Sequence, residues 1–204
     1  MAITHTTKLE AVNTMLSAVG SSPISSLSGA MNADAVVAQN ILDEVLREVL
    51  SFGWAFNTES KVKFAPNTSN EIVLSGNVAR IDHTPGYDTD YDVVQRGTKL
   101  YDRKNHTYTI TDTLTCDVVY FLEYEEIPEA ARRYLMIRSA RIFQDRMVGS
   151  ANHHAYNMQD EMKALADLKD HEGDTGDHSI FQSSDVFRVI NRPTALNNSS
   201  IDTL

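Results

Sequence analysis

The chain has 204 residues, enough for one large domain or two small ones, and its apolar (42%) and charged (23%) fractions are ordinary for a globular protein. No apolar run approaches the roughly 20 residues that span a bilayer, so no membrane insertion is expected. The net charge of −10 argues against a surface that grips nucleic acid by its phosphates, and a single cysteine excludes an internal disulfide.

Two amphipathic patterns open the chain. Apolar residues spaced three or four apart predict a helix over about residues 7–19, capped by Thr6 or Thr7 and ended by Gly20. Residues 36–50 repeat an aliphatic pair every four residues, which predicts a second helix that starts near Asp34 and carries eight aliphatic side chains on one stripe. Such a stripe needs a partner surface, and the other helical patterns lie late in the chain.

The middle of the chain has the patterns of short strands. The most regular one covers residues 114–124, where every second residue from Leu114 to Tyr124 is apolar or cysteine while the other face is mixed. This indicates an antiparallel sheet with one covered side. A hairpin is expected around Lys104-Asn105. Shorter strands are predicted at residues 61–64, 71–74, 78–81, 99–103 and 106–111.

Two further helices are predicted after the strands. The first begins at Pro128 and runs to about Val148, and the second covers about residues 152–170. The apolar set expected to face the core on this last helix is Tyr156, Met158, Met162, Leu165 and Leu168. After His171 the chain is rich in Gly, Asp, Ser and Asn. This composition predicts a tail that is flexible, or ordered only on a partner.

The sequence therefore predicts an α+β fold, in which N-terminal and C-terminal helices form one bundle around an inserted antiparallel β domain and an extended tail follows. The predicted boundaries are residues 1–58 plus 127–171 for the helical body, 59–126 for the β domain and 172–204 for the tail. Trp54 and Phe56, just past the second helix, are expected to form the core of the domain junction, because aromatic side chains bury large areas.

Charge is unevenly distributed over the last two helices. Residues 132–146 carry five arginines, and residues 159–177 carry seven acids. Two interpretations are open: solvated helix faces, or a basic face of one subunit that pairs with the acidic stretch of the next. On the second interpretation, the candidate interface residues are Arg132, Arg138, Arg141, Arg146, Asp160, Glu161 and Asp167, with the apolar Phe187 and Ile190 of the tail.

No motif predicts a catalytic centre, a metal site or a cofactor. The acidic turn at residues 88–92 lacks the glycine and the final glutamate of a calcium loop, and His153-His154 are adjacent rather than one helical turn apart. Cys116 falls on the apolar face of a strand, as a buried small residue does. The cluster of Glu123, Glu125 and Glu126 leaves paired-carboxylate glycoside chemistry open as an alternative.

Several short motifs, in order, resemble the tail tubular protein A family of short-tailed phages. They are Gly53-Trp54-Ala55-Phe56-Asn57, Leu100-Tyr101-Asp102-Arg103, Ile127-Pro128-Glu129 with Arg133-Tyr134, and Ala140-Arg141 with Phe143, Arg146 and Gly149. The resemblance covers about residues 8–170. The tail beyond residue 171 shows no such match.

The resemblance implies a structural protein of the virion tail, made in the host cytoplasm. Members of the family form a twelve-subunit ring that joins the portal to the tail nozzle, surrounds the DNA ejection channel and supports tail-fibre attachment. Genomic DNA is then expected to pass through without specific binding. The alternatives are a polysaccharide hydrolase that acts during phage adsorption and a small adaptor or DNA-binding module, and the negative charge argues against DNA binding.

Overall fold

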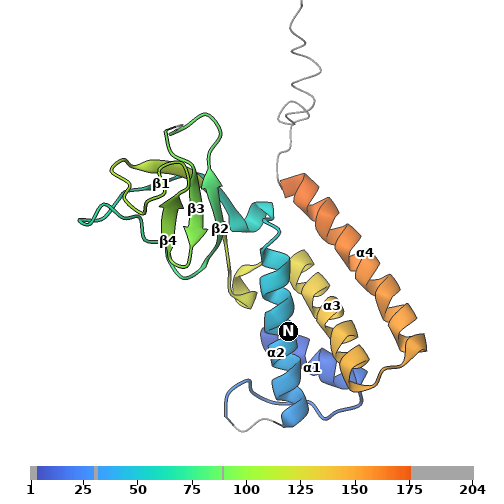
Figure 1. Ribbon diagram of the computed structural model, residues 1–204. Helices are drawn as coiled ribbons and strands as arrows, with labels where there is room; N and C mark the ends of the chain where they lie inside the picture. Colours follow the sequence, from blue (N-terminus) through green and yellow to red (C-terminus); the bar gives the residue numbers. More distant parts are fainter. Residues whose placement is uncertain (1–3, 30–31, 89, 176–204) are drawn as a thin grey trace, which may run out of the picture.

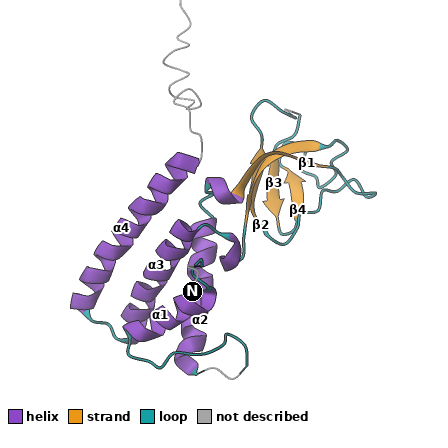
Figure 2. Cartoon of the chain, turned by 180° about the vertical axis from the view of Figure 1, so that it is seen from behind, coloured by secondary structure: helices purple, strands orange, loops and turns teal. Residues whose placement is uncertain are grey.

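The computed structural model describes residues 4–29, 32–88 and 90–175. Over these residues the chain has an α+β fold, as the sequence predicts, with a helical part and a part built of antiparallel strands (Figures 1 and 2). The tail that contains Phe187 and Ile190 lies outside the described residues. The helices are α1 (Lys8–Ala18), α2 (Ala33–Leu50), α3 (Glu129–Met147) and α4 (Ala151–Thr175), with short 3-10 turns η1 (Ala55–Asn57) and η2 (Tyr124–Glu126).

Side-chain caps define where the first two helices begin. Thr7 caps α1 in a capping box with Glu10, as expected. The cap of α2 is Asn32 rather than Asp34, because the Asn32 side chain accepts a hydrogen bond from the amide of Ala35. Asp34 lies within the first turn, where its carboxylate interacts favourably with the helix dipole.

The helices from both ends of the chain share one hydrophobic core. Val45 of α2 and Leu135 of α3 belong to the same buried cluster, although 90 residues separate them in sequence. Figure 1 shows α3 between α2 and α4, with α1 packed against the lower ends of α2 and α3. The predicted stripe of α2 is correct except at its start, where Val36 and Val37 are exposed and alanines 35 and 38 are buried instead. A four-residue repeat drifts around a 3.6-residue helix, so its first pair has turned away from the core.

Helix α4 differs most from its prediction. It is longer at both ends, and three of its expected core residues are exposed: Tyr156 (71%), Met158 (44%) and Met162 (57%). Its buried residues are Glu161, Ala164 and Leu168. The physical reason is that α4 packs chiefly along α3, so only a narrow stripe of its surface is covered.

The strands form two small antiparallel sheets. One has the order β1-β5-β2 and the other is the pair β3-β4. Together with the segment at residues 72–74 they enclose a second hydrophobic cluster, distinct from the helical one. The strands are β1 (Thr58–Phe64), β2 (Val78–His83), β3 (Val93–Arg96), β4 (Lys99–Asp102) and β5 (Leu114–Tyr120).

The strand predictions at residues 71–74 and 106–111 and the hairpin prediction are wrong in detail, because neither range forms a strand. Residues 71–74 make only an isolated bridge, between Val73 and Lys99, and the hairpin joins β3 to β4 rather than turning at Lys104-Asn105. The Asp102 carboxylate accepts hydrogen bonds from the Lys104 amide and the Asn105 side chain. These bonds turn the chain locally, so the ladder beyond Asp102 ends in a single bridge to Thr107.

Strand β5 connects the two clusters. It ends at Tyr120 rather than at residue 124, and Tyr124 belongs to η2. Cys116 and Val118 lie in the cluster of the strands, whereas Tyr124 is buried among the helices. The division into a helical body and an inserted β domain at residues 59 and 126 stays a prediction, which the two separate clusters support.

Candidate interaction surfaces

Arg132 lies inside the helical part and not on its surface, which differs from the prediction of an interface residue. The residue is 7% exposed. Its Nε donates to the carbonyl of Ile127 at 2.9 Å, one terminal nitrogen donates to the carbonyl of Thr6 at 2.9 Å, and the other donates to the carbonyl of Glu125. The guanidinium therefore ties the start of α3 to the segments before α1 and around η2. Sequence alone does not distinguish it from its exposed neighbour Arg133.

Glu161 is the centre of an ion-pair network within the chain. This buried carboxylate of α4 accepts a hydrogen bond from Arg138 at 2.8 Å and a second one from Arg141, both on α3. The Arg141 pKa is raised, chiefly by its hydrogen bond to Glu161. The basic and acidic stretches thus pair within one subunit at these three residues, because α3 and α4 lie side by side (Figure 1).

Helix α2 supplies further ion-pair partners for arginines of α3. Arg138 also pairs with Glu48 at 2.6 Å, and Arg146 makes two bonds to Glu44 at 3.0 and 3.1 Å. The Arg146–Glu44 pair is about half exposed, so it contributes little to stability. Glu48 and Glu44 are 90 and 102 residues away from their arginine partners in sequence, and no local sequence pattern predicts these pairs.

The remaining predicted acids lie on the outward face of α4. At about 100° per residue, Tyr156, Asp160, Lys163 and Asp167 fall within one arc of the helix, and the centre of this arc lies roughly 100° around the helix from the buried residues Glu161, Ala164 and Leu168. All four are exposed. We call this set the outer strip of α4. Of the predicted interface residues within the described ranges, Arg146, Asp160 and Asp167 are exposed, and Arg146 is already paired with Glu44.

A groove runs along the other edge of α4, where it meets α3. Its larger hollow has a volume of about 440 Å³, and a second hollow of about 220 Å³ shares three of its residues. Phe52, at the rim, is 68% exposed. We call it the α3–α4 groove; its main lining residues are Phe52, Trp54, Tyr134, Arg138, Met158, Met162, Leu165 and Lys169.

The predicted junction residues Trp54 and Phe56 pack against the helical cluster. Their rings are parallel, with centroids 6.4 Å apart, and both residues are half-buried. Trp54 Nε1 donates to the carbonyl of Val49 at 2.9 Å. Gly53 before them has a φ of +78°, and a Cβ there would lie 3.0 Å from the side chains of Arg80 and Val119.

Asn57 is the buried centre of this junction, and the sequence reasoning missed it. Its amide nitrogen donates to the carbonyls of Leu50 at 2.9 Å and Tyr120 at 2.7 Å, and its side-chain oxygen accepts from the Trp54 amide at 2.8 Å. One side chain therefore joins the end of α2 to the end of β5. An asparagine among aromatic residues after a helix end is a signal that could have identified it.

The acidic clusters considered for chemistry have structural partners. Glu126 accepts the Glu123 amide at 2.8 Å, and Asp88 accepts the Thr115 amide at 2.6 Å. Among the residues that the structure describes, no three His, Cys, Asp or Glu side chains gather as a metal site would require. Over the same residues, no helix is long and apolar enough to cross a membrane.

Cys116 is expected to resist thiol reagents in the folded protein. It is buried on β5, and burial, with Asp88, Asp117 and Asp82 nearby, raises its pKa to about 12. At pH 8 only about one thiol in ten thousand is then ionised, and the thiolate is the reactive form. We expect at least about a hundredfold slower labelling by iodoacetamide than in urea-unfolded protein, as measured by mass spectrometry. Equal rates in both states would contradict the burial.

Comparison with known proteins adds a family relationship. A family model described as tail tubular protein matches residues 9–178, a range that takes in every helix and strand described above except the first residue of α1. No curated protein matches the chain significantly.

Proposed function

The chain belongs to the tail tubular protein family, structural components of the phage virion tail, and on that premise we propose that it is a ring-forming adaptor. The ring would join the portal to the tail nozzle, with twelve copies around the DNA channel and a surface for tail fibres. The observation that carries the proposal is the family match over residues 9–178. It is supported by apolar side chains that are exposed on two different helices. The family is structural rather than enzymatic.

A ring requires two different surfaces that meet head to tail. Exposed Val36 and Val37 lie at the start of α2, and exposed Tyr156 lies on α4. These helices are on opposite sides of α3 (Figure 1). The two patches are thus separate and dissimilar, which supports a heterologous contact. The arginines of α3 contribute less than expected, because Glu44, Glu48 and Glu161 of the same chain already pair with three of them.

The charge of the chain supports passage of DNA without binding. The net charge of the chain is −10. An acidic lining repels phosphates and does not retain the genome. The strand part, at the other end of the molecule from the start of α2, would face outward or toward the nozzle (Figure 2).

Electron microscopy of the purified chain, alone and mixed with the portal protein, tests the adaptor role. We expect rings with twelve copies that cap the portal. Native mass spectrometry of the same samples counts the subunits. If the chain stays monomeric in both samples, the proposal is wrong.

Reversing the charge of Asp160 and Asp167 to lysine is expected to impair ring assembly or DNA ejection without unfolding the subunit. Both side chains are exposed, so the free energy of unfolding should change by less than about 0.5 kcal/mol per site. Ring yield by electron microscopy and ejection from assembled virions are the measurements. A matched control is Glu59→Lys with Asp90→Lys, which changes the net charge equally on the strand part, where both acids are exposed. If both pairs behave alike, the outer strip has no special role.

A further inference from the structure

The α3–α4 groove is apolar, open and wide enough for side chains from another segment. Phe52, Met158 and Met162 stand exposed along it, and the hollow beside Trp54 and Leu165 measures about 440 Å³. Apolar side chains in such a groove gain stability when a segment covers them. The question is which segment does so.

The groove is separate from the outer strip that the ring proposal uses. On the helical wheel of α4, Met158, Met162, Leu165 and Lys169 fall within about 60° of one another. The outer strip points about 90° or more away from all of them. A single contact with a neighbouring subunit through the outer strip therefore leaves the groove uncovered.

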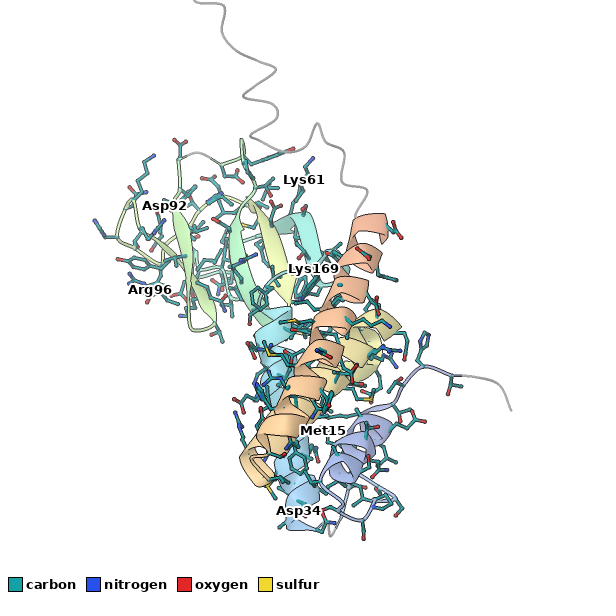
Figure 3. All side chains as sticks on the ribbon, turned by 90° about the vertical axis from the view of Figure 1, so that its right-hand side faces the viewer. Met15, Asp34, Lys61, Asp92, Arg96 and Lys169 are labelled. Carbon is teal, nitrogen blue, oxygen red and sulfur yellow. The ribbon has the colours of Figure 1, made fainter. Side chains whose placement is uncertain are left out.

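We propose that the α3–α4 groove is the docking site of the chain's own C-terminal segment, residues 176–190. The described chain ends where the groove begins. Glu172, in the last turn of α4, accepts a hydrogen bond from the Ala55 amide, which places the end of α4 next to Phe52, Gly53 and Trp54 at the mouth of the groove. Figure 3 labels Lys169 on this part of α4, toward the strands.

The length of the chain beyond α4 suits a return along the groove. An extended chain spans up to about 3.5 Å per residue, so Phe181 can lie about 20 Å from Thr175 and Ile190 about 50 Å from it. Helix α4 has 25 residues and is thus about 37 Å long. The segment can therefore reach either hollow of the groove without strain.

The chemistry of the segment matches that of the groove. Residues 176–190 contain two apolar clusters, Ile180-Phe181 and Val186-Phe187 with Val189-Ile190, separated by polar residues. Asp177 and Asp185 flank the first cluster, and the mouth of the groove carries Lys169 together with Glu48, which pairs with Arg138. The apolar clusters of the segment suit the apolar side chains of the groove.

A pair of engineered cysteines tests the contact in the full chain. The variant Met162→Cys with Ser184→Cys places one thiol in the groove and the other thiol three residues before Phe187. The native Cys116 is buried and does not compete. Mild oxidation should form an intrachain disulfide, read as a monomer on non-reducing gels and confirmed by peptide mass spectrometry. The matched control is Lys163→Cys with Ser184→Cys, since Lys163 is the next residue and belongs to the outer strip.

We expect the Met162 pair to crosslink about tenfold faster than the Lys163 pair, because docking raises the local thiol concentration. Adding Phe187→Asp should lower the rate to that of the control pair. Equal rates for the two pairs, or no effect of Phe187→Asp, would overturn the proposal. Crosslinked dimers at micromolar protein would assign the groove to a second copy instead. Since the readout is made on the free subunit, it is independent of whether the chain forms a ring on the portal.

Discussion

Replacing Arg132 with alanine is expected to lower the free energy of unfolding by about 3 kcal/mol. The guanidinium of this buried residue donates hydrogen bonds to three main-chain carbonyls, those of Thr6, Glu125 and Ile127. Alanine removes all three donors at once and opens space beside the Tyr124 ring, whose centroid lies 5.9 Å from the guanidinium. Urea denaturation monitored by circular dichroism measures the loss.

The neighbouring arginine is the matched control for this experiment. Arg133 is exposed, so Arg133→Ala should change the stability by less than about 0.5 kcal/mol. Arg132→Lys should recover only part of the loss, because an ammonium cannot reproduce the planar fork of a guanidinium. If Arg132→Ala and Arg133→Ala were equally mild, the internal role of Arg132 would be refuted and its place among the interface residues would be restored.

Replacing Glu161 with glutamine is expected to loosen α4 from α3 and to cost about 2 kcal/mol of stability. The carboxylate bonds to Arg138 and Arg141, and breaking a buried pair on one side leaves its partners uncompensated. We place the cost below that of a fully buried pair because the two arginine side chains are 23% and 18% exposed, so water screens them in part.

Hydrogen exchange separates this effect from a general loss of stability. Helix α4 packs chiefly along α3, so the amides of α4 should exchange faster in Glu161→Gln while those of α1 and α2 change little. Asp160→Asn, the exposed neighbour on the same helix, is the control and should leave exchange unaltered. Uniform acceleration over all helices would contradict a local role for Glu161.

The helices and their common core could be predicted from the sequence because their signals are periodic. The repeat in residues 36–50 and the motifs at both ends of α1 identify helices that need one another. Helix α4 could not be predicted equally well. Its apolar residues at 156, 158 and 162 suggest a core face, but how much of a helix is covered depends on how many neighbours it has, and α4 packs chiefly on α3.

The interface prediction shows the limit of reading charge along a chain. A run of arginines has the same appearance whether its partners are solvent, a neighbouring subunit or the same molecule. Here Glu48 and Glu44 lie 90 and 102 residues before their arginine partners, and Arg132 bonds to carbonyl groups that no sequence pattern marks. Asp160 and Asp167 kept their predicted exposure because no helix lies over them.

Asn57 affects how much sequence change the strand part of this protein can tolerate. The amide of Asn57 holds the carbonyls of Leu50 and Tyr120, so the two chain segments that connect strands and helices are fastened at one point. Insertions, deletions or replacements between residues 59 and 119 can then leave the spacing of α2 and α3 intact.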